Sequence, residues 1–420
     1  MSTLLTIAVR NLVRHRLRTI ITALTICVGV ASFLAIDSIM DGSNKDAFDN
    51  IVYLTGSALK IHTAEYLAEK NSLPLKYGIQ DAESMMDSIR EKPGVVGTAP
   101  RVRFLGQLSN YKDMLPVSAV VIDPRRDAEV FRISEYVESG HYFSDGGSGE
   151  ILIGKDLAED LGLAPGSSVV LSANDVNEVM NALDFTVAGV INAPVSGLNT
   201  NGVFLSQQDG EGLLGLNGLV TEIDVQMEWR PGAPFEELAK TSGALAADLS
   251  KSYPSLAFDP IAEQAKSFLA LIASKSKFTS IIIVIVLAIA LVGIVNTVLM
   301  SVYERIREVG VMRAMGFQGG EVRRMFFLEG TLIGLLGSVA GMLLGGALVW
   351  LLVVRGMDMN SFGFDISSFN MPISPVIHGV WKPQSFIQIL IIGTVSAMIA
   401  ALLPARKAAK FVVTRALRFE

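Results

Sequence analysis

The chain has 420 residues, of which 50% are hydrophobic, and its formal net charge is −6. This composition favours a membrane protein over a soluble enzyme or a disordered chain. Residues 41–277 contain 33 acidic and 19 basic residues, a net charge of −14, whereas the remainder of the chain carries +8. An acidic segment and a basic remainder fit a protein on an anionic cytoplasmic leaflet, and we expect no nucleic-acid partner.

The chain opens with "LLTIAVRNLVRHRLRT", in which apolar residues alternate with arginines. This pattern predicts an amphipathic helix over 1–18 that either lies on the inner membrane surface or acts only as a topology signal. Four uncharged runs follow along the chain, each long enough to supply the ~20 apolar residues that cross ~30 Å of hydrocarbon. The runs are 19–36, 278–303, 330–354 and 383–405.

Lys and Arg residues concentrate in three places along the chain: before the first run, between the second and third runs, and after the fourth run. The positive-inside rule therefore predicts cytoplasmic termini and an extracytoplasmic segment 41–277 in a bacterial cytoplasmic membrane. The single Cys27 lies inside the first span, so we expect no disulfide in that segment. The predicted divisions are spans at 19–40, 278–303, 330–354 and 383–405, a cytoplasmic loop at 304–329, an outer loop at 355–382 and a cytoplasmic tail at 406–420.

The extracytoplasmic segment has the character of an α+β domain. In "VTEIDVQM", Ile223, Val225 and Met227 alternate with polar residues, which predicts a half-buried strand. Strand–helix–strand patterns open and close the segment, so we expect outer parts at about 57–104 and 220–260 around a β-rich insert at about 105–219. Helical stalks are expected to join this domain to the first two spans. The predicted fold class is a membrane α-helical protein with four transmembrane helices and this domain inserted between the first two.

Catalytic and metal sites are not indicated. "GEILIGKD" is one residue short of a phosphate-binding loop, because Asp156 stands where Ser or Thr is required and its carboxylate would repel phosphate. The four histidines are scattered and give no metal-ligand spacing. We therefore expect no catalytic residue and no metal or cofactor in this chain.

Two features of the spans predict helix packing. Gly337, Gly341 and Gly345 recur every four residues, with Gly334 close to the same face, and allow close backbone approach within the chain or against a second copy. Asn296 is a polar residue at depth that needs a partner across a helix interface or a cavity.

The loop between the second and third spans is short, charged and broken by glycine. It predicts a helix through Met315, a break at "GFQGG" and a new helix from Glu321. Val309, Met312 and Met315 are apolar on a helix too short to be stable alone in water, so we expect it to dock on lipid headgroups or in a protein groove.

The segment "SVYERIREVGVMRAMGFQGGEVRRMFFLEGTLIGLLGSVAGMLLG" (301–345) resembles the signature of FtsX-like permeases, the membrane subunits of MacB-type ABC transporters. "AVRNLVRHRLRTIITALTICVGV", "GEILIGKDLAEDLGLAPGSSVVL" and "PARKAAKFVVTRALRFE" resemble other parts of the same family, although Val412 and Val413 replace its usual Asp-Pro. The resemblance implies a coupling helix at about 304–316 that docks on a cytoplasmic ABC ATPase. The residues expected to couple are Glu304, Arg305, Arg307, Glu308, Val309, Met312, Arg313 and Gly316.

The resemblance also implies a dimer of permeases, with itself or a second permease, and two ATPase chains that bind ATP and Mg²⁺. The residues point the same way, since the cytoplasmic parts are too small to form an ATPase domain. We expect a permease that transmits ATP-driven motion to extracytoplasmic handling of an amphiphile or lipoprotein, as in LolC/LolE-like systems, with a periplasmic adaptor or lipoprotein carrier as a further partner. The alternatives are a MacB-like exporter of drugs or peptides and an FtsX-like regulator of a cell-wall hydrolase that transports nothing.

Overall fold

The computed structural model describes residues 2–14, 16–143, 148–230, 232–359, 361 and 376–409. The chain forms two compact units, of which unit 1 comprises 1–43, 271–357 and 376–420, and unit 2 comprises 44–270 and 358–375. Most of the predicted outer loop at 355–382 and of the tail at 406–420 lies outside the described residues.

Six helices of the described residues build unit 1, four of them long. They are α1 (Ser2–Arg14), α2 (Arg16–Asn50), α11 (Lys266–Glu304), α12 (Ile306–Ala314), α13 (Gly319–Arg355) and α14 (Pro383–Ala409), and α2 and α11 continue into unit 2. Among the residues that the structure describes, three helical segments are long and apolar enough to cross a membrane, namely Thr19–Thr55, Gly319–Arg355 and Pro383–Ala409. The predicted second span lies on α11, where the apolar segment found among the described residues is Leu291–Glu304, so the count of four spans stays a prediction.

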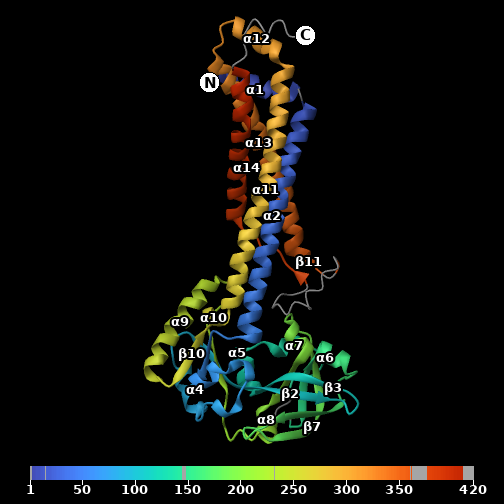
Figure 1. Ribbon diagram of the computed structural model, residues 1–420, viewed down its shortest axis with the longest axis vertical. Helices are drawn as coiled ribbons and strands as arrows, with labels where there is room; N and C mark the ends of the chain where they lie inside the picture. The colour runs from blue at the N-terminus through green and yellow to red at the C-terminus, as the bar shows by residue number, and fades with distance from the viewer. Residues whose placement is uncertain are drawn as a thin grey trace. The chain divides into compact units, whose positions relative to one another are not determined.

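The long helices of unit 1 run side by side in a bundle (Figure 1) and bury apolar side chains between them. Val30 of α2, Val298 of α11 and Ile333 of α13 are each less than 5% exposed and belong to one apolar cluster. At the start of α14, Lys382 forms an ion pair with Asp41 at 2.6 Å and Ser385 donates to Asp37 at 2.6 Å. These polar contacts tie the part of α2 that belongs to unit 1 to the beginning of α14.

The glycine row of α13 packs against α2. A methyl group at Gly341 would lie 2.7 Å from the Cys27 carbonyl oxygen, and one at Gly337 would lie 2.8 Å from that of Ala23. Gly345 approaches Ala31 and Leu34 in the same way, whereas Gly334 faces Ala397 of α14. Of the two alternatives that the sequence leaves open for this row, the structure shows packing within the chain.

Replacing Gly341 with Ala should destabilise the bundle by about 1–3 kcal/mol, because overpacking forces two backbones apart. Thermal unfolding of the full chain in a mild detergent measures the effect. Gly346→Ala is the matched control, since the nearest atom to a methyl group there is 3.6 Å away. Equal melting temperatures for the two variants would contradict close packing at Gly341.

Unit 2 contains one ten-stranded mixed sheet in the order β10-β1-β9-β2-β3-β8-β5-β7-β4, with β6 paired to β2 and β7. Its strands are β1 (Leu59–Thr63), β2 (Val95–Ser109), β3 (Met114–Ile122), β4 (Val137–Gly140), β5 (Glu150–Gly154), β6 (Ser168–Asn174), β7 (Met180–Ile191), β8 (Gly202–Ser206), β9 (Glu222–Met227) and β10 (Leu256–Pro260). Two short strands, β11 (Met357–Asp358) and β12 (Val376–Ile377), lie outside this sheet.

The other helices of unit 2 precede β1, connect the strands or follow β10. They are the α-helices α3 (Ala64–Ala68), α4 (Ala82–Arg90), α5 (Pro124–Val130), α6 (Lys155–Asp160), α7 (Ser196–Asn201), α8 (Gln207–Leu214), α9 (Phe235–Ser252) and α10 (Ile261–Gln264), the π-helix η1 (Ile51–Thr55), and the 3₁₀-helices η2 (Lys70–Ser72), η3 (Leu75–Tyr77) and η4 (Ile133–Tyr136). The long strand β2 pairs with β9 through its first half and with β3 through its second half. It thereby joins the strands of the predicted outer parts to those of the predicted insert in one sheet.

The prediction that β9 is half-buried is wrong, because all six of its residues are buried. Its polar residues are covered by cationic side chains from neighbouring strands. Glu222 accepts hydrogen bonds from Lys60 at 3.2 Å and from Arg103 at 2.6 Å, and Asp224 lies 3.3 Å from the Lys60 ammonium group. Although its own burial opposes the effect, these cations hold the pKa of Glu222 well below its usual range.

Burial lowers the pKa of the neighbouring His62, although the Glu222 carboxylate opposes this shift. His62 is fully buried, and Lys60, Glu222 and Lys70 are the charged groups that influence it. Below pH 6.5 the unfolded chain therefore binds a proton more readily than the folded one, so the stability of unit 2 should fall as the pH falls through this window. The loss would appear as faster hydrogen exchange of the β1 amides at pH 5.5 than the pH dependence of the intrinsic exchange rate predicts. The loss should be smaller in His62→Asn, and an equal loss in both proteins would contradict the role of His62.

Candidate functional site

The loop between α11 and α13 forms a compact helical corner at one end of the bundle in unit 1 (Figure 1). α11 ends at Glu304 because the backbone of Arg305 leaves helical geometry, with φ −111° and ψ 18°. The short helix α12 then runs from Ile306 to Ala314. Gly316 has φ +101°, a conformation that glycine adopts at little cost, and it turns the chain towards α13.

A buried ion pair fixes the beginning of α12. The Arg305 guanidinium donates to Glu308 at 2.9 Å and to Glu329 of α13 at 3.2 Å, and Ser301 of α11 donates to Glu329 at 3.4 Å. Arg305 and Glu329 are each 5% exposed, so this pair is largely shielded from water. The contact joins three helices through one carboxylate. A second, exposed pair links Glu308 to Arg14 of α1 at 3.5 Å.

The end of α12 is held by different contacts. Arg313 donates through Nη1 to the carbonyl oxygen of Ala409, the last residue of α14, at 3.3 Å. A capping box between Gln318 and Glu321 then begins α13 and satisfies backbone N–H groups at its first turn. Both ends of α12 are therefore tied to other helices of the bundle.

The two faces of α12 differ. Ile306 and Val309 are buried, and Val309 packs in a cluster with Val322, Phe326 and Ala405. The opposite face carries Val311, which is 45% exposed, and Met315, directly after the last residue of the helix, is 68% exposed on the same side. Neither side chain is covered by the residues that the structure describes.

The residues predicted to couple fall into two groups. Glu304, Arg307, Glu308 and Gly316 are exposed. Arg305 and Val309 are buried and Met312 and Arg313 are half-buried, so these four hold α12 on its own chain. Glu329, which sequence reasoning missed, is the acidic partner of Arg305. Its one available signal was its position as the last charge before an uncharged span.

Asn296 is exposed on α11, in line with Val292 and Met300, which are 66% and 57% exposed. Residues four apart lie on one helical face, so these three share a face that is turned away from the bundle of their own chain. The partner that a polar group in a span requires is therefore expected outside this face.

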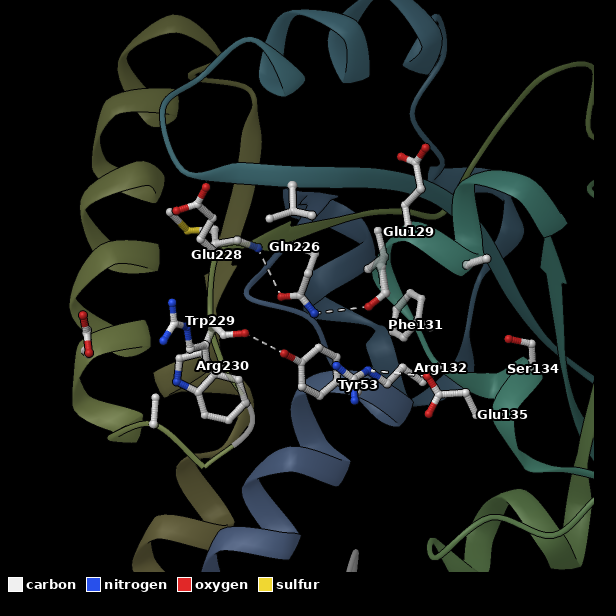
Figure 2. A pocket seen from close by; sticks show the side chains of 16 residues that line it. Tyr53, Glu129, Phe131, Arg132, Ser134, Glu135, Gln226, Glu228, Trp229 and Arg230 are labelled. Atoms are coloured by element: carbon white, nitrogen blue, oxygen red, sulfur yellow. Dashed lines mark hydrogen bonds and ion pairs between the residues drawn. The ribbon is translucent and has the colours of Figure 1, made fainter.

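Unit 2 contains a separate groove of about 910 Å³ (Figure 2). Tyr53 and Trp229 lie on one side of it, where the Tyr53 hydroxyl donates to the Trp229 carbonyl oxygen at 2.8 Å and the Arg132 guanidinium lies 4.1 Å from the Tyr53 ring centre. Four glutamates, including Glu129 and Glu135, line it together with apolar side chains and Arg230. The groove presents charged and aromatic contacts and lacks a nucleophile paired with a base among the residues that line it.

In "GEILIGKD", the segment that resembles a phosphate-binding loop, the lysine is engaged in an ion pair. Lys155 pairs with Glu138 at 3.0 Å on the surface of unit 2, and the helix that follows Gly154 has six residues. Among the residues that the structure describes, no group of three or more His, Cys, Asp or Glu side chains is placed to hold a metal ion.

An apolar helix bundle, a helical corner with an exposed apolar face, and an α+β domain within the same chain define the class of membrane permease subunits. Two family comparisons agree with this class. The FtsX-like permease C-terminal family matches residues 280–413, and the MacB-like periplasmic core domain matches residues 19–240. The chain belongs to the FtsX-like permease family of MacB-type ABC transporters, and the resemblance seen in its sequence is confirmed.

Relatives of the chain extend over most of its length. A lipoprotein-releasing system transmembrane protein LolC of Xylella fastidiosa is 23% identical over 94% of this chain and 92% of its own. An uncharacterized ABC transporter permease of Methanocaldococcus jannaschii is 24% identical over 99% of this chain and 98% of its own length. A macrolide export ATP-binding/permease protein MacB of Vibrio parahaemolyticus is 24% identical over 94% of this chain but 57% of its own. Among solved structures, the extracellular domain of the transporter YknZ matches 48% of this chain and 98% of its own at 14% identity and a TM-score of 0.33.

Proposed function

We propose that the chain couples ATP hydrolysis by a separate cytoplasmic ATPase to the handling of an amphiphile or a lipoprotein on the extracytoplasmic side. The observation that carries this proposal is the asymmetry of α12. One face packs on the chain's own cluster, and the other exposes Val311 and Met315 beside Arg307 and Glu308. A helix that is anchored at both ends and open on one face can receive a push from a partner and pass it to the bundle.

Two helices can carry that motion onward. α2 has 35 residues and α11 has 39, so at 1.5 Å per residue they are about 52 and 58 Å long, well beyond the ~30 Å of the hydrocarbon layer. Both run without interruption from residues of unit 1 into residues of unit 2. A continuous helix transmits displacement better than a flexible loop, which supports mechanical transmission to the α+β domain.

The remaining partners follow from the family and from exposed surfaces. Two ATPase chains would bind ATP and Mg²⁺, and a second permease would cover the Asn296 face of α11 and satisfy its amide in the membrane. A LolC relative is named as part of a lipoprotein-releasing system, which favours an acylated or amphiphilic substrate. An adaptor or a lipoprotein carrier would then receive the substrate outside the membrane.

Purification of the tagged chain from its native membrane tests this function. We expect an ABC ATPase and a permease to copurify, and ATP hydrolysis by the complex in nanodiscs to rise when an acylated peptide is added. Release of that peptide to a soluble acceptor would support the lipoprotein branch. ATP hydrolysis by the pure chain alone, or recovery of a cell-wall hydrolase with no stimulation by amphiphiles, would contradict the proposal.

A further inference from the structure

A second pocket in unit 2, of about 430 Å³, is lined by more cationic than anionic side chains. Lys60 of β1, Arg103 of β2 and Lys70 of η2 line it, and Glu222 is the carboxylate among its lining residues. Ile51 and Leu73 add apolar wall. All of these residues belong to unit 2, so the pocket is formed within one compact unit.

The cations of the pocket are held in place but retain hydrogen-bond donors. Lys60 is 5% exposed and contacts Glu222 at 3.2 Å and Asp224 at 3.3 Å, which leaves one of its three N–H groups. Arg103 donates through Nε to Glu222 and through Nη2 to the Thr55 carbonyl oxygen, which leaves Nη1 available. Glu222 is shared by Lys60 and Arg103, and Asp224, which is not among the lining residues, is a second carboxylate in contact with Lys60.

Tyr66 points to a ligand independently of these charges. Its side chain lines the pocket and is 1% exposed, yet its hydroxyl has no hydrogen-bond partner in the described part of the chain. The Thr221 side chain lies within hydrogen-bonding influence of the Tyr66 hydroxyl and lowers its pKa, although Thr221 also donates to the Arg101 carbonyl oxygen at 3.2 Å and accepts from the backbone N–H of Arg103 at 3.1 Å. Burial raises the pKa of Tyr66 to about 12, so the hydroxyl is a proton donor at neutral pH.

We propose that this pocket binds the oxyanion of an amphiphilic ligand, with Tyr66, Arg103 and Lys60 donating to a phosphate or carboxylate group. Buried donors without partners are costly, and an oxyanion accepts several hydrogen bonds at once. The pocket has room for more than the oxyanion itself, and Ile51 and Leu73 offer contact to an apolar part of the ligand. The role in transport rests on the proposed function, whereas binding does not.

Binding to the permease alone, without any ATPase, tests the site. The full chain in phosphatidylcholine nanodiscs is titrated by calorimetry with dihexanoyl phosphatidic acid, inorganic phosphate and, as the zwitterionic control, dihexanoyl phosphatidylcholine. We expect saturable binding of the phosphatidic acid and at least about 10-fold weaker binding of the control. Equal binding of inorganic phosphate would assign the site to a free oxyanion and would overturn the proposal that its ligand is an amphiphile. Absence of binding by every phosphate probe would overturn the site itself.

Tyr66→Phe identifies the pocket, because it removes a hydroxyl that has no partner in the free protein and should leave the melting temperature unchanged. We expect it to weaken phosphatidic acid binding about 10-fold or more, the effect of one hydrogen bond to a charged group. Lys70→Gln should weaken binding less, since Lys70 is half-exposed and paired with Asp259 at 3.3 Å. The control is Tyr111→Phe, whose hydroxyl contacts Asp184 outside the pocket. Unchanged affinity in Tyr66→Phe would overturn the assignment, and failure of ATPase coupling with intact binding would instead contradict the proposed function.

Discussion

Replacing Glu329 with Gln should release α12 from the bundle and abolish the stimulation of the partner ATPase. The substitution keeps the size of the side chain but leaves the Arg305 guanidinium buried with half of its ionic contacts. Breaking a buried ion pair by removing one partner costs about 3–5 kcal/mol, because a charge is left without compensation in a medium of low polarity. The exposed Glu308 remains as a contact for Arg305 and limits the loss.

Hydrogen exchange of residues 306–314 in the intact complex measures this release, and ATP hydrolysis measures the coupling. Arg14→Gln is the matched control, since it breaks a pair to Glu308 in which both side chains are well exposed. Exposed pairs contribute about 0–1 kcal/mol, so this variant should exchange and hydrolyse like the unmodified protein. Similar exchange in both variants would show that the Arg305–Glu329 pair does not anchor α12.

The apolar spans and the helical corner could be predicted from the sequence because their signals are local. Uncharged runs mark α13 and α14, and the glycine at position 316 marks the end of α12. The face on which α12 packs could not be predicted in this way. Val309 and Met315 look alike in the sequence, and the difference arises because Val322, Phe326 and Ala405 arrive from other helices to cover Val309.

The same reason explains the error at β9. Alternation of Ile223 and Val225 with Glu222 and Asp224 is the pattern of a strand with one wet face. The polar face is buried because Lys60, 162 positions away from Glu222, supplies a charge from the neighbouring strand. Strand β8, "GVFLS", is likewise buried at every position and shows no alternation. Long-range charge pairing and burial on both faces leave no periodic trace in a single sequence.

The second large effect is expected at the exposed face of α12. Val311→Asp together with Met315→Asp should prevent the ATPase from binding while the permease itself stays folded, because neither side chain is needed for packing within the chain. Two unpaired carboxylates buried in an interface cost several kcal/mol, so the double change should weaken the complex at least about 100-fold. Recovery of the ATPase with the tagged permease, and ATP hydrolysis by the recovered complex, measure the loss.

The control for this prediction is Leu105→Asp on β2 of unit 2, which also places a charge at an apolar position that is 59% exposed. That variant should bind the ATPase normally, because the proposed contact lies on α12. If the Val311 and Met315 double variant retained the ATPase at full yield, α12 would not be the docking element. If it retained the ATPase but lost stimulation by amphiphiles, the exposed face would transmit motion without providing affinity, and docking would have to be sought on residues outside α12.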